Sequence, residues 1–230
     1  MTPLMSARGL TRILETTPPV PLVRSVDLDV MPGQFQTVIG PSGCGKSSLL
    51  YLLGLLDRPT AGSLTFRGQD TISLDGDQRA QLRLAHFGFV FQFHFLLPEF
   101  TALENVLLPM RRLVKLGETE MKRQALSVLE ELDMATHADK TPDRMSGGQR
   151  QRVAIARALA NDPSVVLGDE PTGNLDSENS ARVIRILQRI AHEQGRAVVC
   201  VTHDLTVAEA ADKRIYMLDG SIEKTEGRFP

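Results

Sequence analysis

Short apolar runs and longer stretches with apolar residues at helical spacing follow one another along the chain. Continuous or alternating apolar runs are typical of strands, whereas apolar residues three and four positions apart are typical of amphipathic helices. The expected strands are residues 22–30, 35–39, 63–67, 164–167, 197–201 and 214–218. The expected helices are residues 48–56, 77–86, 101–111, 118–133, 146–160 and a segment that begins at 177. Their alternation predicts an α/β fold with a mainly parallel sheet covered on both faces.

Phenylalanines are concentrated in one region, since six of the nine lie between residues 87 and 100. Five of them occupy every second position from 87 to 95, which predicts a buried strand face rather than a binding surface. The following residues, 95–100, break this alternation. They are the better candidate for an exposed docking patch.

Length and charge limit the classes of function. The 230 residues are enough for one well-buried α/β domain with room for a smaller lobe. A net charge of −2 gives no general reason to expect a nucleic-acid partner, so none is expected. Residues 1–15 lack the apolar core of a secretory signal, and the longest apolar stretch, 49–56, is far shorter than the roughly 20 residues of a membrane span. Two cysteines suggest a reducing cytosol rather than a disulfide framework.

A Gly-x-x-x-x-Gly-Lys-Ser phosphate loop begins at Gly40, between an expected strand and an expected helix. Its glycines let backbone N–H groups surround phosphate oxygens, and the following helix directs its positive end to the same place. Lys46 would contact the β- and γ-phosphates of ATP, and the Ser47 hydroxyl would bind Mg²⁺. A glycine-rich turn with an exposed lysine is the alternative, which the flanking elements disfavour. The expected nucleotide-binding residues are Gly40, Pro41, Ser42, Gly43, Cys44, Gly45, Lys46, Ser47 and Ser48.

Two carboxylates follow the apolar run at 165–167. Open α/β sheets place ligands at the carboxyl ends of their strands, so both side chains are expected near the phosphate loop. Asp169 is suited to hold Mg²⁺, directly or through water, and Glu170 could orient and deprotonate the water that attacks the γ-phosphate. A solvated acidic turn is the alternative, and the presence of a phosphate loop makes it less favoured.

A second glycine-bearing helix start is formed by Ser146, Gly147, Gly148 and Gln149. The free N–H groups and the dipole of such a helix make another candidate anion site. Taken alone, the segment fits a simple N-cap at Ser146 better than an anion site.

The segment from Met145 to Gln149, followed by residues 150–157, resembles the signature of ATP-binding cassette (ABC) ATPases. The resemblance covers essentially the whole chain. It implies that Gln92 is the lid-loop glutamine near Mg²⁺, that Asp176 belongs to a dimer-contact loop, and that His203 is the switch histidine. Glu170, His203 and Gln92 would then be catalytic, and Ser47, Gln92 and Asp169 would face the metal.

The family also implies an architecture. A P-loop NTPase (RecA-like) core would comprise about residues 1–92 and 161–230, with an N-terminal antiparallel β element. A helical signature subdomain would comprise about 93–160, within a single domain of 1–230. Two copies would form a homodimer, with each ATP between the phosphate loop of one copy and Ser146, Gly147, Gly148 and Gln149 of the other.

Two positions depart from the family pattern. Members usually carry an aromatic residue upstream of the phosphate loop that stacks on adenine, whereas this chain has Arg12-Ile13-Leu14. Aliphatic contact or stacking by Arg12 would have to substitute. Met145 replaces the usual leucine of the signature, which is a swap of similar volume.

Residues 92–106 and 169–176 are similar to the ATPases that partner MacB-type permeases, and residues 92–106 especially resemble LolD of lipoprotein-releasing complexes. This resemblance implies integral membrane permease subunits of MacB, LolC or LolE type as partners. It also implies a peripheral location at the cytoplasmic face of the inner membrane, and lipoprotein release as the function. The alternatives are a MacB-like efflux or export ATPase, an FtsE-like cell-division ATPase and, more distantly, a soluble ABC protein of DNA repair or translation.

Overall fold

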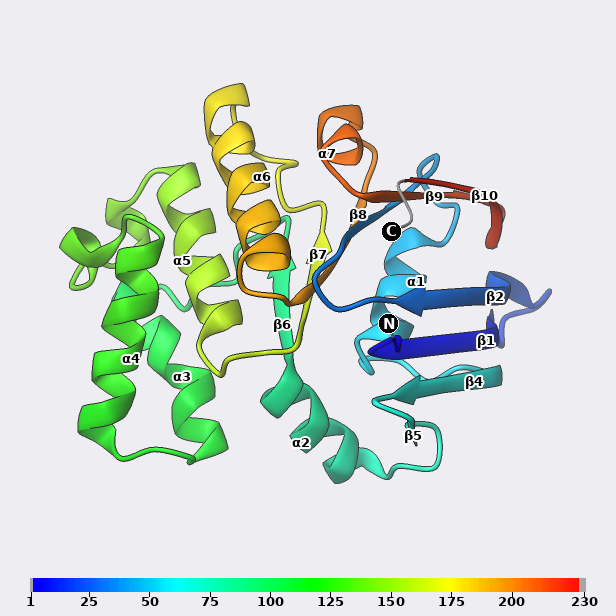
Figure 1. Ribbon diagram of the computed structural model, residues 1–230, viewed down its shortest axis with the longest axis horizontal. Coiled ribbons are helices and arrows are strands. Elements are labelled where there is room, and N and C mark those ends of the chain that lie inside the picture. Colours follow the sequence, from blue (N-terminus) through cyan, green and yellow to red (C-terminus); the bar gives the residue numbers. More distant parts are fainter. Residues whose placement is uncertain (1, 228–230) are drawn as a thin grey trace.

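The computed structural model describes residues 2–227, so residues 1 and 228–230 of the expected domain lie outside it. Six of the described strands form one sheet in the order β10-β9-β3-β8-β7-β6 (Figure 1). All neighbouring pairs are parallel except the β9–β10 hairpin at one edge. The mainly parallel sheet is therefore confirmed. Its strands are β3 (Phe35–Ile39), β6 (Phe87–Phe91), β7 (Val165–Asp169), β8 (Ala197–Thr202), β9 (Lys213–Leu218) and β10 (Ser221–Gly227).

A second, antiparallel sheet contains the N-terminal part of the chain, in the order β2-β1-β4-β5. Its strands are β1 (Met5–Leu14), β2 (Val20–Val30), β4 (Ala61–Phe66) and β5 (Gln69–Asp70). The antiparallel N-terminal element is thus confirmed. Only β2 and β4 had been expected as individual strands, because Gly9, with a positive φ of 58°, interrupts the alternating pattern of β1.

Seven α-helices and two short 3₁₀ helices connect the strands within the described residues. Three of the α-helices, α2, α3 and α5, begin with a capping box, in which the N-cap side chain and the third helical residue satisfy each other's backbone N–H group. The helices are α1 (Lys46–Leu53), α2 (Gly76–His86), α3 (Ala102–Leu113), α4 (Glu118–Glu131), η1 (Ala135–His137), η2 (Pro142–Arg144), α5 (Gly147–Leu159), α6 (Ser177–His192) and α7 (Leu205–Glu209).

Two hydrophobic cores lie on opposite faces of the six-stranded sheet, as the alternation along β8 makes clear. Val199 and Val201 pack with α1 and the antiparallel sheet, whereas Val198 and Cys200 pack with residues of α3, α4, α5 and α6. Figure 1 places α1 on one side of the sheet and α5 and α6 on the other. The helices α3, α4 and α5 lie within the residues expected to form a helical subdomain, whose boundaries stay a prediction.

The phenylalanine-rich region differs from the expected strand. β6 ends at Phe91, and the residues Phe93 and Phe95 are each 63% exposed. Phe95 has a φ of 47°, so the chain has left the extended conformation there. The prediction of one buried strand face through residue 95 was therefore wrong beyond Phe91. Phe95 and Leu97 are exposed in the segment 95–100, although their role in docking stays a prediction.

Two further elements, α7 and β10, were not expected from the sequence, because α7 is only one turn long and β10 is largely polar. Across residues 2–227, the structure contains no helix with the length and hydrophobicity that a membrane crossing demands.

Candidate active site

The phosphate loop follows β3 and leads into α1, as expected. Its backbone is pressed against neighbouring strands, because a Cβ atom at Gly40 would overlap the carbonyl oxygen of Met217 and one at Gly45 would overlap that of Leu22. Gly43 and Gly45 also have positive φ angles of 80° and 100°, which favour glycine. These constraints fix the curved backbone that the motif requires.

Lys46 is buried at the centre of this loop. Its Nζ donates hydrogen bonds to the carbonyl oxygens of Gly40 at 2.7 Å and Pro41 at 2.9 Å. Both acceptors are neutral, so a phosphate could supply the counter-charge for the ammonium group. The rest of the expected set differs in exposure: Pro41, Ser42 and Gly43 are exposed, Ser47 and Ser48 are half-buried, and Cys44 is buried.

Asp169 lies directly beside the loop, at the end of β7. The Ser47 hydroxyl donates to its Oδ1 at 3.0 Å, and the Tyr51 hydroxyl donates to its Oδ2 at 2.9 Å. The pKa of Tyr51 is raised mainly by burial and, to a smaller extent, by the hydrogen bond to Asp169. The phenol therefore keeps the proton that it donates. Tyr51 was missed as a site residue, although its position four residues after Ser47 puts both side chains on one face of α1.

Glu170 and His203 also lie together, because β7 and β8 are adjacent and end at the same edge of the sheet. Glu170 Oε1 accepts from the His203 backbone N–H at 3.1 Å and lies 2.8 Å from His203 Nδ1. Its Oε2 accepts from the Thr202 hydroxyl at 3.0 Å. The Glu170 side chain is 16% exposed and that of His203 is 71% exposed. The carboxylate is therefore fixed by three donors: the Thr202 hydroxyl, the His203 backbone N–H and the His203 ring.

The backbone of Glu170 is unusual for a side chain of this kind, since its φ is 49°. Non-glycine residues in the left-handed region are uncommon and concentrate at functional sites. The N–H of Glu170 donates to the carbonyl of Val201, and its own carbonyl accepts from the N–H of Gly173. These two hydrogen bonds fix the turn at Glu170. Because of this turn, the Asp169 side chain reaches Ser47 and the Glu170 side chain reaches Thr202.

Gln92 follows the end of β6 and contacts the loop after β7. Its Nε2 lies 3.5 Å from Asn174 Oδ1, and Asn174 Nδ2 donates to the Gln92 carbonyl at 3.1 Å. Within residues 2–227, no hydrogen bond joins Gln92 to Ser47 or Asp169. The metal-facing role of Gln92 stays a prediction.

The second glycine-bearing helix start is well ordered by its own side chains. The Ser146 hydroxyl accepts from the Gln149 N–H at 3.3 Å, and Gln149 Oε1 accepts from the Ser146 N–H at 2.8 Å. Gly148 packs so closely against Asn179 of α6 that a Cβ atom would overlap the amide. Asn179 in turn donates to Asp176 from its backbone and side chain, which lowers the pKa of Asp176.

The two candidate anion sites are separated within one chain. The phosphate loop precedes α1 and the Ser146 helix start precedes α5, and these helices cover opposite faces of the sheet (Figure 1). In the described part of the chain, no hydrogen bond connects residues 40–48 with residues 146–149.

The residues at the loop fit Mg²⁺ bound together with a nucleotide. Ser47 and Asp169 place one hydroxyl and one carboxylate oxygen 3.0 Å apart. Mg²⁺ usually keeps several waters and takes the remaining ligands from one or two carboxylates and substrate phosphates. Residues 2–227 contain no group of three or more His, Cys, Asp or Glu that could hold a metal ion, and this mode of binding requires none.

Arg12, which was considered for a contact with adenine, is already paired in the structure. Its Nε donates to Asp57 Oδ2 at 2.6 Å, and its Nη1 donates to the Ile13 carbonyl at 3.1 Å. Whether Arg12 or an aliphatic side chain contacts adenine stays a prediction.

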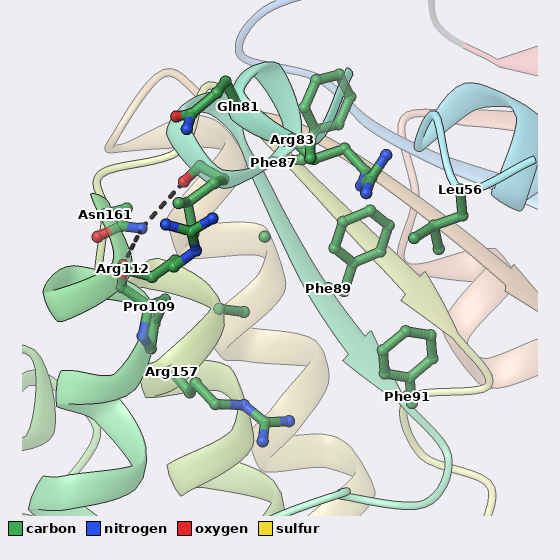
Figure 2. Close-up of a pocket in the computed structure, with 14 residues that line it drawn as sticks. Leu56, Gln81, Arg83, Phe87, Phe89, Phe91, Pro109, Arg112, Arg157 and Asn161 are labelled. Atoms are coloured by element: carbon green, nitrogen blue, oxygen red, sulfur yellow. Dashed lines mark hydrogen bonds between the residues drawn. The ribbon is translucent and has the colours of Figure 1, made fainter. Parts of the chain in front are cut away.

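A groove with a volume of about 450 Å³ lies beside β6 (Figure 2). In Figure 2, Phe89 and Phe91 lie on the side of Leu56, with Arg112 and Arg157 on the helices opposite. Asn161 holds two of the walls together, since its Nδ2 donates to the carbonyls of Leu84 and Pro109. The lining residues include three arginines and no acidic residue; they are Leu56, Ala80, Gln81, Arg83, Leu84, Phe87, Gly88, Phe89, Phe91, Pro109, Arg112, Arg157, Ala158 and Asn161.

Comparison with known proteins identifies the family. A family model described as ABC transporter matches residues 23–173. The chain is 46% identical over 222 residues to the lipoprotein-releasing system ATP-binding protein LolD 2 of Caulobacter vibrioides, covering 96% of this chain and 97% of that relative. It is also 46% identical over 209 residues to the macrolide export ATP-binding/permease protein MacB of Syntrophobacter fumaroxidans, covering 90% of this chain but only 29% of that longer protein.

A solved structure agrees with the fold. The dimeric bacterial ABC transporter cassette MJ0796 has a TM-score of 0.90 and 37% identity to this chain, with 98% of this chain and 99% of that one covered. A second structure of the same cassette is a post-hydrolysis state bound to ADP and phosphate. The chain therefore belongs to the ABC transporter family, as an ATP-hydrolysing cassette of the LolD/MacB-like group.

Proposed function

We propose that this chain closes on a second copy of itself, so that each ATP lies between the phosphate loop of one copy and the Ser146 helix start of the other. The separation of these two anion sites within one chain carries the proposal. Both are helix N-termini with free N–H groups, which favour phosphate oxygens. A two-fold dimer brings a loop and a helix start together twice. The dimeric arrangement of the related cassette MJ0796 supports this assembly.

The site residues then have separate tasks. Lys46 holds the β- and γ-phosphates, while Ser47 and Asp169 hold Mg²⁺, which neutralises phosphate charge. Glu170 takes the proton of the attacking water, because its carboxylate is fixed in place by the Thr202 hydroxyl and the His203 backbone N–H.

Three other residues sense and transmit the state of the nucleotide. His203, which is bonded to Glu170, contacts the γ-phosphate, and Gln92 approaches Mg²⁺ from the loop after β6. Asp176 lies at the start of α6, beside the Ser146 helix start, and contributes to the dimer contact. Loss of the γ-phosphate on hydrolysis removes the charge that holds the two copies together, so the dimer opens.

The groove beside β6 binds the permease in this proposal. Its floor is aromatic and aliphatic, and its charged side chains are all arginines. A short permease helix with an apolar face and acidic residues at its edges is complementary to both features. Arg157 connects this groove to the loop that follows Gln92, because its guanidinium donates to the carbonyls of His94 and Phe95. Movement of that loop would thus be transmitted through Arg157 to the bound helix.

Replacing Leu56 by glutamate is expected to weaken permease binding by about tenfold or more, because a charge would enter the apolar side of the groove. Leu56 is already 46% exposed, so folding and ATP hydrolysis by the isolated chain should change little. Leu218→Glu is the matched control, since Leu218 is 45% exposed and lies outside the groove. Both variants would be tested for co-purification with the permease. Equal retention of the permease by the two variants would place its binding surface elsewhere.

The cargo that we propose is lipoprotein, released from the inner membrane by a LolC/LolE-type permease with this ATPase bound peripherally at the cytoplasmic face. The observation that carries this assignment is the match to a LolD relative over 97% of its length. A MacB-like efflux system is the second candidate, since the MacB relative has the same identity over its matched part. An FtsE-like division ATPase uses the same residues and is a further alternative.

The proposed cargo is tested by capture from detergent-solubilised membranes of the source organism, with ATP and a Glu170→Gln variant as bait. Mass spectrometry of the bound proteins should identify a LolC/LolE-type permease that carries lipoprotein. An efflux adaptor or a division protein would instead move the assignment within the family. Recovery of only ribosomal or nucleic-acid-binding proteins would overturn the transport function.

A further inference from the structure

We infer that His137 is a positioning residue for ATP hydrolysis, which fixes the Ser146 helix start through the side chain of Gln149. This inference rests on the proposed dimer, in which that helix start meets the nucleotide of the other copy. His137 lies at the end of η1, nine residues before Ser146, and its Nε2 is 2.8 Å from Gln149 Nε2.

The orientation of the Gln149 amide is determined by a backbone group. Gln149 Oε1 accepts from the Ser146 N–H at 2.8 Å, and a backbone N–H can only donate. The amide nitrogen of Gln149 must therefore face His137. Since an amide NH₂ group can only donate, His137 Nε2 must accept.

The tautomer of His137 follows from this geometry. A neutral imidazole with an accepting Nε2 carries its proton on Nδ1. Nδ1 lies 2.8 Å from the Thr136 hydroxyl, which can accept that proton. A protonated ring would place an N–H against the amide of Gln149, so only this neutral tautomer satisfies both contacts.

The backbone of His137 is anchored on the core. Its N–H donates to the carbonyl of Met134, and its carbonyl accepts from the N–H of Lys140. Met134 and Ala138, the residue after His137, are both buried in the core cluster that includes α3 and α5. The ring thus projects from a rigid support rather than from a free loop.

The consequence is a helix start that is formed before the second copy arrives. His137 holds the Gln149 amide, which holds the Ser146 N–H, while the Gln149 N–H bonds the Ser146 hydroxyl. Without His137, Gln149 can rotate to other partners, and the helix start must be ordered again when the dimer closes. Groups that are ordered before association bind more tightly than groups that must be ordered during it.

The geometry is tested first by ¹⁵N NMR of the histidine side chains in the nucleotide-free chain. We expect the His137 signals, identified by their loss in His137→Gln, to be those of the Nδ1–H tautomer. A dominant Nε2–H tautomer would contradict the hydrogen-bond assignment.

The functional effect is tested on the Glu170→Gln background, where ATP should drive a stable dimer. His137→Ala is expected to raise the ATP concentration for half-maximal dimerisation about three- to tenfold, the effect of one neutral hydrogen bond. His137→Gln, whose amide oxygen can accept from Gln149, should restore most of this loss. ADP binding to the phosphate loop of the same chain should stay unchanged, whereas general misfolding would weaken it as well.

His192→Ala is the matched control. His192 is the last residue of α6, pairs with Asp212 and does not contact Gln149. If the Glu170→Gln chain fails to dimerise with ATP, the proposed dimer is wrong. If it dimerises and His137→Ala does so at the same ATP concentration, the dimer stands and the role of His137 is refuted.

Discussion

Replacing Glu170 by glutamine is expected to lower ATP hydrolysis by about 10²- to 10⁴-fold, the range for loss of a general base. A glutamine amide cannot accept the proton of the attacking water at neutral pH. ATP binding should persist, because Lys46, Ser47 and Asp169 are untouched and Glu170 does not bond to any of them. The variant should then remain as a closed dimer with ATP.

The structure accommodates this substitution with little strain. Glutamine has nearly the same volume as glutamate, and its amide oxygen can accept from the Thr202 hydroxyl or the His203 N–H, as Glu170 does. The unfolding temperature should therefore be close to that of the wild type. Any loss of hydrolysis can then be attributed to chemistry rather than to folding.

The measurement is phosphate release at saturating ATP, together with the molecular mass in solution with and without ATP. Glu178→Gln is the control, since Glu178 is a carboxylate at the start of α6 whose side chain is 85% exposed and pairs with Arg182 at 3.8 Å. It should hydrolyse ATP at the wild-type rate. A Glu170→Gln variant with near-wild-type hydrolysis would show that another group, or water alone, accepts the proton.

The sequence was most informative where one short segment determines both structure and chemistry. The spacing from Gly40 to Ser47 predicted the strand, turn and helix around the phosphate loop, since glycine, lysine and serine at these positions have local conformational consequences. The carboxylates at 169 and 170 could be placed at a ligand-binding edge, because buried parallel strands end there.

Contacts between distant segments were not predictable in the same way. Tyr51 reaches Asp169 only because the sheet puts the end of β7 beside α1, and His137 reaches Gln149 because η1 packs on the core before α5 begins. The phenylalanine pattern was misleading for a related reason. Its period of two continues past Phe91 into a loop, where solvent rather than a second layer surrounds Phe93.

Replacing Gly45 by alanine is expected to lower the free energy of unfolding by about 3 kcal/mol or more, because two separate costs add. The φ angle of 100° is one that residues with a Cβ atom rarely adopt. The new methyl group would also overlap the carbonyl oxygen of Leu22, a backbone atom of β2 rather than the end of a flexible side chain. The loop must therefore shift.

That shift would also remove the nucleotide site, since Lys46 is the next residue and its ammonium is centred by the loop carbonyls. We expect ATP to bind about a hundredfold more weakly or not measurably. Each factor of ten in affinity corresponds to about 1.4 kcal/mol of binding free energy. Chemical denaturation would give the stability, and a fluorescent nucleotide would give the affinity.

Gly43→Ala is the matched control for stability: its φ is also positive, at 80°, but no atom lies within 4 Å of the added Cβ. It should lose only about 1–2 kcal/mol. Equal losses in the two variants would mean that backbone conformation alone, and not the contact with β2, shapes the loop.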